Sequence, residues 1–218
     1  MLKPHFYLCC RALAAVCAVL WLASCTTTPQ PIDADASEQA KVLWGQHQQQ
    51  LTSYSQWSIK GRAALRSDSD SWSAALTWKQ YDDSYEVRLA GPFGKGAVNI
   101  DGNDEQVSVH IAGRQAVVSN DPELLLSQHL GWTVPIESLA YWLRGLPAPG
   151  KVDALILDQS GVISHLEQQG WRIDYSAYRP LKGVSLPRKI QIEDDSLRLK
   201  LVLDRWRLGK EQGVAARR

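Results

Sequence analysis

Cysteine is scarce in this sequence and is confined to its first residues. The four cysteines are Cys9, Cys10, Cys17 and Cys25, and no other follows in the chain. A domain that begins after Cys25 can therefore form no disulfide and no cysteine-based metal site.

An excess of charge of one sign is also missing. The 24 Lys and Arg residues nearly balance the 23 Asp and Glu residues, which leaves a formal net charge of +1. Acidic and basic residues are interspersed, so the composition gives no electrostatic case for nucleic acid binding.

Motifs for catalysis and for cofactor binding are absent. His47, His110, His129 and His165 lack the spacing of a zinc-binding pair, and none lies near a Gly-x-Ser-x-Gly turn. The glycine-rich stretch 91–96 differs from a phosphate-binding loop, because its lysine spacing is wrong and a strand follows it. We therefore predict a protein that is not an enzyme and that binds no metal and no dissociable cofactor.

The hydrophobic run at the start of the chain is short. It extends from Ala12 to Leu22, too few residues to cross a bilayer as a helix, and it is preceded by the basic Lys3 and Arg11. This order of basic and apolar residues is typical of an export signal.

The motif Leu22-Ala23-Ser24-Cys25 closes this segment and resembles the bacterial lipobox, at which a peptidase cuts before the cysteine. The resemblance implies a signal peptide over residues 1–24 and covalent diacylglyceryl and N-acyl groups on Cys25. Thr26 stands where an Asp retains such lipoproteins in the inner membrane. The resemblance therefore also implies the periplasmic face of the outer membrane of a Gram-negative bacterium. The alternative is an ordinary cleaved signal with an incidental cysteine.

The remaining chain divides by composition into three parts. Residues 25–37 are rich in Thr, Pro, Asp and Ala without periodicity, which predicts a flexible tether. Residues 38–208 are long enough for one domain with a sizeable core, which we expect to be monomeric. Residues 209–218 form a basic tail that we expect to be disordered.

Alternation of apolar and polar residues with a period of two dominates the domain. It covers residues 57–66, 72–79, 85–89, 98–100 and 107–111, and later 154–157, 162–167, 171–176, 190–192 and 197–204. Near residues 203–206 the phase slips by one, which is typical of a bulge. The short connections favour an antiparallel meander of about ten or eleven strands, with all apolar faces pointing one way.

Three helices are predicted beside the strands. The first is amphipathic and carries Val42, Trp44, His47 and Leu51 on one stripe. The other two begin near Pro122 and Pro135. These two either plug the end of a barrel or form a lid over an apolar cavity.

Tryptophan is abundant, whereas phenylalanine and methionine are rare. The chain holds nine Trp, two Phe and one Met, and large stiff aromatic side chains make extended apolar walls. Candidate cavity residues lie on the apolar faces of the strands and in the second lid helix: Trp57, Leu65, Trp72, Leu76, Trp78, Trp142 and Leu143. A solid core produces the same pattern, so a filled barrel is the alternative.

Phe93 is predicted at the tip of the loop 91–96, between two strands. It either anchors the loop in the core or forms an exposed apolar tip that can enter a membrane.

Several stretches together resemble the LolB family of outer-membrane lipoprotein receptors. They are residues 44–49, 91–94, 135–147, 171–175 and 197–206. The resemblance implies an incomplete antiparallel β-barrel of about 11 strands with an N-terminal helix and a two-helix lid. It also implies that acylated lipoprotein cargo is taken from a periplasmic carrier similar to LolA and placed in the outer membrane. In this resemblance Cys25 is the lipidated cysteine, and Phe93 matches an exposed apolar residue, often Leu, that promotes membrane insertion.

Three other classes of protein fit the sequence less well. A structural or assembly lipoprotein would have a filled barrel and no ligand. A periplasm-facing hydrolase would need a catalytic constellation that the sequence lacks. A membrane-spanning barrel would need no lipid anchor, and the polar strand faces carry too many Arg and Lys to meet hydrocarbon.

Overall fold

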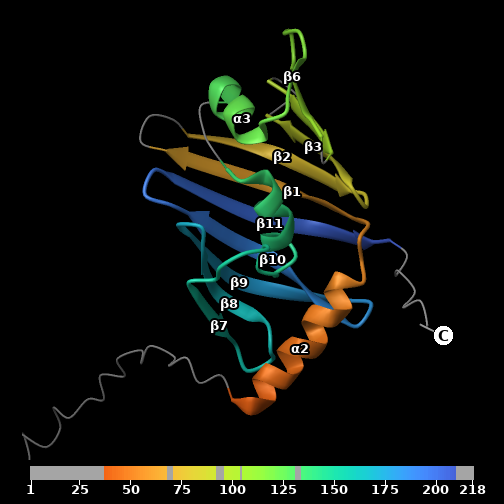
Figure 1. Ribbon diagram of the computed structural model, residues 1–218, viewed down its shortest axis with the longest axis vertical. Helices are drawn as coiled ribbons and strands as arrows, with labels where there is room; N and C mark the ends of the chain where they lie inside the picture. Colours follow the sequence, from red (N-terminus) through yellow and green to blue (C-terminus); the bar gives the residue numbers. More distant parts are fainter. Residues whose placement is uncertain (1–36, 68–70, 92–95, 104, 131–133, 210–218) are drawn as a thin grey trace, which may run out of the picture. The chain divides into compact units, whose positions relative to one another are not determined.

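The computed structural model describes residues 37–67, 71–91, 96–103, 105–130 and 134–209, and the element labels follow Figure 1. The helices in these ranges are α2 (Glu38–Thr52), α3 (Pro122–Leu130) and α4 (Ile136–Trp142). The strands before α3 are β1 (Trp57–Ser67), β2 (Ser71–Gln80), β3 (Ser84–Ala90), β4 (Val98–Asn103), β5 (Val107–Ile111) and β6 (Val117–Ser119). Those after α4 are β7 (Ala154–Leu157), β8 (Ile163–Gln168), β9 (Trp171–Leu181), β10 (Val184–Glu193) and β11 (Leu197–Leu208).

All the strands form one antiparallel sheet, in the order β6-β5-β4-β3-β2-β1-β11-β10-β9-β8-β7. The chain runs as a meander from β1 to β6, passes through α3 and α4, and returns as a second meander from β7 to β11. Pairing of β1 with β11 joins the two halves at the centre of the sheet. The edges β6 and β7 are not paired with each other, so the barrel is incomplete, as the family resemblance implies.

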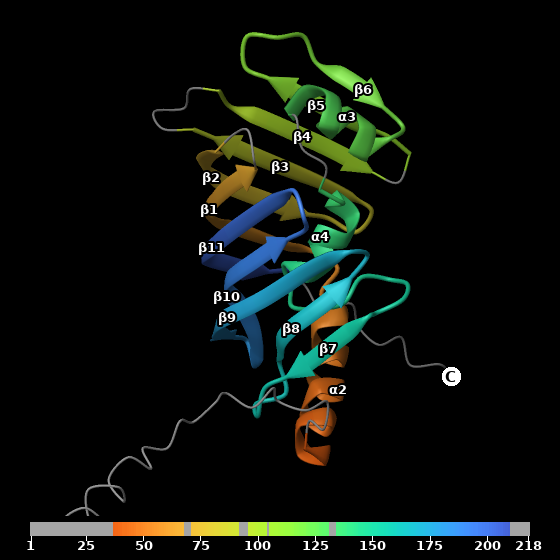
Figure 2. The same cartoon turned by 90° about the vertical axis from the view of Figure 1, so that its left-hand side faces the viewer.

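The helices α3 and α4 cover one face of this curled sheet, as the two views show (Figures 1 and 2). The strands turn their apolar residues to that face. In β1, Trp57, Ile59, Ala63 and Leu65 are buried, whereas Lys60 and the other residues between them are more exposed. One sided burial of this kind is why a period of two appears in the sequence.

A bulge interrupts the seam between the two halves. Lys60 pairs with Arg205 and Gly61 pairs with Leu203, so Asp204 is the extra residue in β11. A Cβ atom on Gly61 would lie 2.2 Å from the carbonyl oxygen of Val202, so only glycine fits this close approach. The phase slip that the sequence predicts near residues 203–206 is confirmed.

Helix α2 begins at Glu38, where the Ser37 side chain accepts a hydrogen bond from the backbone N–H of Ala40. Its buried side chains are Ala40, His47 and Leu51. Val42 is 60% exposed, so its predicted place on the apolar stripe is wrong. In a helix with 3.6 residues per turn, position 42 lies away from positions 40, 47 and 51.

Strand β6 is an element that the sequence analysis missed. Val117 and Val118 are both exposed, so the strand has no buried face and no alternation to detect. Among the described helices, none has the length and apolar character needed to span a membrane.

Candidate functional site

An apolar cavity of about 50 Å³ lies between the sheet and the lid helices α3 and α4. Its walls are entirely aliphatic or aromatic. They comprise Ala63, Leu65, Trp72, Leu76, Trp78, Val87, Leu89, Ile100, Leu199 and Leu201 from the sheet, and Leu126, Val134, Ile136, Leu139 and Leu143 from the lid region. None of the described lining residues offers a polar group to hold water there, so the cavity is suited to apolar ligands.

Five of the seven predicted cavity residues line this space. They are Leu65, Trp72, Leu76, Trp78 and Leu143. They come from β1, β2 and the end of α4, so the structure brings together residues nearly 80 positions apart. Period-two alternation places the strand residues on one face, and the curl of the sheet directs that face at α4.

Trp57 and Trp142 are buried but are not among the lining residues. Trp57 stacks on Trp78 with ring centroids 5.9 Å apart. The Trp142 indole N–H donates to Gln168 Oε1 at 3.0 Å, and its ring lies 6.3 Å from that of Trp171. These two residues therefore pack the core beside the cavity.

Helix α4 is fastened to the second half of the sheet by buried hydrogen bonds. Gln168 of β8 is fully buried; its Oε1 accepts from Trp142 and from the Ala148 N–H, and its Nε2 donates to the Ala148 carbonyl at 2.8 Å. The Tyr175 hydroxyl donates to the Trp142 carbonyl at 2.9 Å. Burial raises the pKa of Tyr175 well above its ordinary value, so this hydroxyl remains a donor.

Two further contacts hold the ends of α4. The Ser138 hydroxyl donates to Gln169 Oε1 at 2.8 Å. Arg144, just after the helix, lies over the rings of Tyr141 and Trp57 and donates to the Tyr54 carbonyl at 3.4 Å. Sequence patterns do not reveal these polar anchors, because Gln168-Gln169-Gly170 has the composition of an ordinary turn.

Helix α3 is held differently. Leu125 and Leu126 are buried, and α3 lies beside β5 and β6. Its described polar contacts are local: Asp121 caps the helix by accepting from the Leu124 N–H at 2.9 Å, and Ser127 bonds its own helix. Among the described side chains of α3, none forms a hydrogen bond to the sheet. Among the described residues, apolar packing of Leu125 and Leu126 holds the body of α3, and its cap is joined to β6 by a local bond from the Asp121 N–H to the Ser119 hydroxyl at 3.0 Å.

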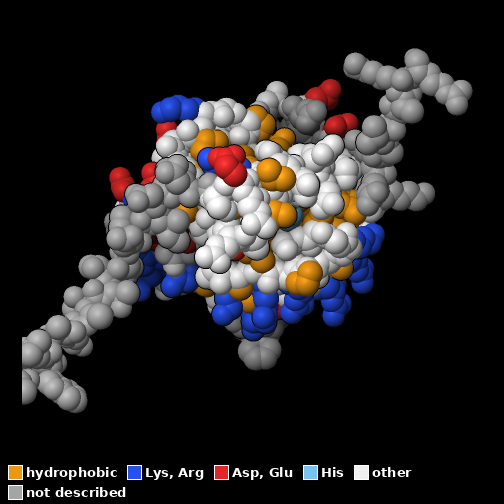
Figure 3. Space-filling view, turned by 90° about the horizontal axis from the view of Figure 1, so that it is seen from below, with side chains coloured by type: hydrophobic (Ala, Val, Ile, Leu, Met, Phe, Trp, Pro, Cys, Tyr) orange, Lys and Arg blue, Asp and Glu red, His pale blue; other side chains and the backbone are white. Residues whose placement is uncertain are grey.

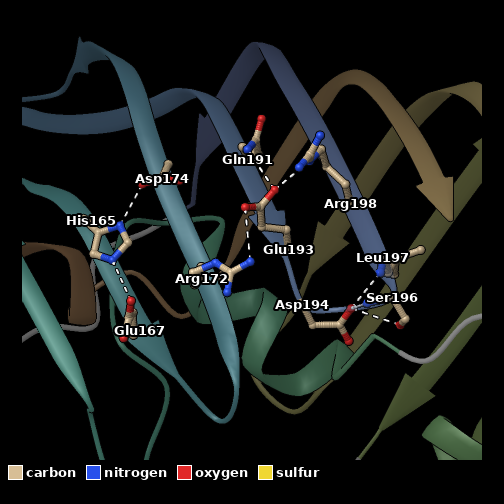
Figure 4. A network of polar contacts seen from close by, with 10 residues as sticks. All are labelled: His165, Glu167, Arg172, Asp174, Gln191, Glu193, Asp194, Ser196, Leu197 and Arg198. Atoms are coloured by element: carbon tan, nitrogen blue, oxygen red, sulfur yellow. Dashed lines mark hydrogen bonds and ion pairs between the residues drawn. The ribbon is translucent and has the colours of Figure 1, made fainter. Parts of the chain in front are cut away.

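Several polar contacts lie together on the opposite face of the sheet (Figure 4). His165 bridges Asp174, at 2.7 Å, and Glu167, at 3.3 Å, while Glu193 pairs with Arg172 and Arg198. Burial opposes protonation of His165, but the two carboxylates outweigh it and raise its pKa. Within the described part of the chain, no serine, threonine or cysteine forms a hydrogen bond with the His165 ring, whose partners are Asp174 and Glu167, and no group of side chains could hold a metal ion.

Two predicted site residues lie outside the described residues. They are Cys25, the predicted lipidation site, and Phe93, the predicted membrane-insertion residue. The signal peptide, almost all of the tether and the tail after Gly209 lie outside them as well.

Comparison with known proteins decides the family. The family model for outer membrane lipoprotein LolB matches residues 55–206, which is most of the chain. The chain belongs to the LolB family. The family resemblance noted in the sequence is thereby confirmed.

Individual LolB relatives match over most of their own length. The outer-membrane lipoprotein LolB of Pseudomonas fluorescens is 40% identical over 163 residues, which cover 75% of this chain and 80% of the relative. The LolB proteins of Pseudomonas paraeruginosa and Nitrosococcus oceani are 35% and 34% identical, over 90% and 92% of this chain and 95% and 98% of theirs. The residues matched by the family model include every described residue that lines the cavity.

Proposed function

We propose that this chain is a lipid-anchored outer-membrane receptor, which accepts acylated lipoproteins in the apolar cavity and inserts them into the outer membrane. Membership of the LolB family, whose relatives are named outer-membrane lipoproteins, supports this role in lipoprotein localisation. The observation that carries the proposal is the cavity, because every lining residue that the structure describes is apolar.

Acyl chains need such a site in order to leave a membrane. Exposure of a hydrocarbon chain to water costs about 0.8 kcal/mol per CH₂ group. An apolar cavity can recover this free energy without nucleotide hydrolysis, and it can release the chain to a bilayer that solvates it equally well. Cys25, as the lipidated residue, would keep the receptor at the membrane where release occurs.

The cavity as it stands is too small for its cargo. Its volume of about 50 Å³ has room for only about four water molecules, since each needs about 10–15 Å³. Binding an acyl chain therefore requires the lid to move. Because α4 is fastened by buried hydrogen bonds and α3 is not, α3 is the helix that opens.

The donor would be a periplasmic carrier similar to LolA, and the receptor would act as a monomer. Transfer in one direction requires the receptor to bind acyl chains more tightly than the carrier does. Phe93, in the loop between β3 and β4, would assist insertion by entering the bilayer.

A transfer experiment tests the proposal with the chain from residue 25 onward and Cys25→Ala. The protein is mixed with a carrier loaded with an acylated lipoprotein, and pull-down shows where the lipoprotein resides. We expect transfer to this chain. Leu126→Gln should reduce capture about tenfold, because burial of an unpaired amide costs about 1–3 kcal/mol.

Leu125→Gln provides the matched control. Leu125 and Leu126 are neighbours on α3, and both are buried, but only Leu126 lines the cavity. Equal capture by the two variants would show that the cavity is not the acyl site. A folded parent protein that captures neither lipoprotein nor a fatty-acyl probe would be a structural lipoprotein with a filled barrel.

A further inference from the structure

Exposed basic residues gather on the face of the sheet that points away from α3 and α4. The basic patch consists of Lys60 and Arg62 of β1, Lys189 of β10, and Arg205 and Arg207 of β11. All five side chains are exposed. In the view from below, Lys and Arg side chains gather along one side of the molecule, although the whole chain is almost neutral (Figure 3).

Strand register brings the members of the basic patch together. Arg62 and Lys189 both pair with Val202, so the three residues form a row across β1, β11 and β10. Lys60 pairs directly with Arg205 in the next row. Like charges directly opposite each other destabilise a strand pair. The fold thus keeps a repulsive pair at the centre of its sheet, which is consistent with an anion bound there.

Few acidic groups neutralise the basic patch. Arg62 Nη2 lies 3.8 Å from Asp204 Oδ2, and both side chains are largely exposed. No described carboxylate lies within 4.0 Å of Lys60, Lys189, Arg205 or Arg207. Arg179 adds another cation at the same place, since it donates to the Asp204 carbonyl at 3.1 Å.

We infer that the basic patch binds the anionic phospholipid headgroups of the bilayer to which the chain is anchored. The surface has charge without apolar anchors, because none of the exposed large hydrophobic residues belongs to it. Protein interfaces usually need such anchors at their centre, whereas clusters of Lys and Arg bind anionic membranes without them.

The length of the tether and the position of the basic patch both agree with a membrane as the partner. The tether of residues 25–37 spans at most about 45 Å, so a lipid on Cys25 keeps the domain near the bilayer. Docking through the basic patch turns the face with α3 and α4 away from the bilayer. The cavity would then face a carrier that arrives from the periplasm.

Thiol labelling of the acylated full chain in vesicles tests the inference. The chain after Cys25 contains no other cysteine, so a single new thiol reports one position. Ala75→Cys is exposed and pairs with Arg62 beside the basic patch. Gln128→Cys is exposed on α3 and serves as the matched control.

Labelling rates are compared in vesicles of phosphatidylcholine alone and of phosphatidylcholine mixed with phosphatidylglycerol. We expect the mixed vesicles to slow labelling of Ala75→Cys about tenfold and to leave Gln128→Cys unchanged. The triple change Lys60→Gln, Arg205→Gln and Arg207→Gln should remove this difference. Salt at about 0.5 M should remove it as well, because it screens charges beyond roughly 5 Å.

Equal labelling of Ala75→Cys in both kinds of vesicle would overturn the inference. The inference would also be wrong if a loaded carrier, and not the anionic lipid, slowed the labelling of Ala75→Cys, because the partner of the basic patch would then be a protein. The inference relies on the proposed membrane anchor but not on acyl binding, and the labelling uses no cargo. Cargo transfer in vesicles of phosphatidylcholine alone tests the proposed function separately, and the triple variant should retain it.

Discussion

The two lid helices differ in what holds them against the same sheet. Around α4, buried donors and acceptors from β8 and β9 reach Trp142 and Ala148, and Gln168 alone makes three of these bonds. Helix α3 carries Leu125 and Leu126 into the core, and among its described residues it forms no buried hydrogen bond to the sheet; only its cap, through the Asp121 N–H, donates to the Ser119 hydroxyl of β6, in an exposed bond. Apolar contacts tolerate sliding and replacement by another apolar group, whereas buried hydrogen bonds do not. A lid built in this way can open at one helix while the other keeps its place.

The largest test of this difference removes the anchor of α4. Gln168→Leu leaves the Trp142 indole N–H and both backbone groups of Ala148 unpaired in the core. We expect the free energy of unfolding to fall by about 3–5 kcal/mol, measured by urea denaturation. Gln106→Ala, at an exposed glutamine, should change it by less than about 0.5 kcal/mol. A small loss for Gln168→Leu would show that α4 is held by packing, as α3 is.

A smaller test removes one bond of the same set. Tyr175→Phe frees the Trp142 carbonyl and should cost about 1.5 kcal/mol. Tyr178→Phe frees the Ile163 carbonyl in a similar way, but that residue is not part of α4. Hydrogen exchange should therefore speed up in α4 for Tyr175→Phe and not for Tyr178→Phe. Identical exchange profiles would contradict the assigned role of Tyr175.

The third test weakens α3 alone. Asp121→Ala removes the cap on the Leu124 N–H, which is worth about 1 kcal/mol. If α3 opens by itself, exchange should rise in α3 while α4 remains protected, and uptake of a fatty-acyl probe should become faster. Asp121→Asn keeps a capping oxygen and should behave nearly as the parent does. Equal deprotection of α3 and α4 would mean that the two helices move as one unit.

The smallest expected effect concerns pH and the strands that hold α4. The carboxylates of Asp174 and Glu167 raise the pKa of His165 above its unfolded value of about 6.5, despite the opposing effect of burial. The stability that the protonated His165 gains from these two carboxylates is therefore complete below about pH 6.5, and it is lost as the pH rises through the folded pKa of His165. The stability advantage of the parent over His165→Gln should fall by about 0.5 kcal/mol or less between pH 6 and pH 8, because the ring is partly exposed.

Denaturation at several pH values gives this difference directly. His47 titrates with the opposite sign, because burial lowers its pKa more than Asp158 raises it. Its effect is present in both proteins and cancels in the comparison. An advantage that grows with pH would contradict the ion pairs assigned to His165.

The sequence predicts more of the strands than of the site. Alternation finds a strand wherever one face is buried, as in β1 with Ile59, Ala63 and Leu65. It misses β6, because Val117 and Val118 are both exposed. It places Val42 on the helix stripe wrongly, because a valine among polar residues is taken for a core residue when neighbouring contacts are unknown.

The residues around the cavity are also predicted only in part. Of the seven predicted acyl-cavity residues, the structure places Leu65, Trp72, Leu76, Trp78 and Leu143 at the cavity wall, while Trp57 and Trp142 pack beside it. All seven are apolar residues at positions that face the core, so alternation cannot separate a wall from a filled interior. Gln168 was not predicted, because a polar residue before a turn gives no sign that it is buried.

Local sequence determined the secondary structure, the apolar face of each strand and the LolB family, because these depend on residue type and spacing along the chain. The tertiary structure decided which residues line the cavity, that α4 is anchored while α3 is not, and that the basic residues of three strands form one patch. These features arise from contacts between residues far apart in the chain. Pairing of β1 with β11 creates several of these contacts, and no single stretch of sequence encodes that pairing.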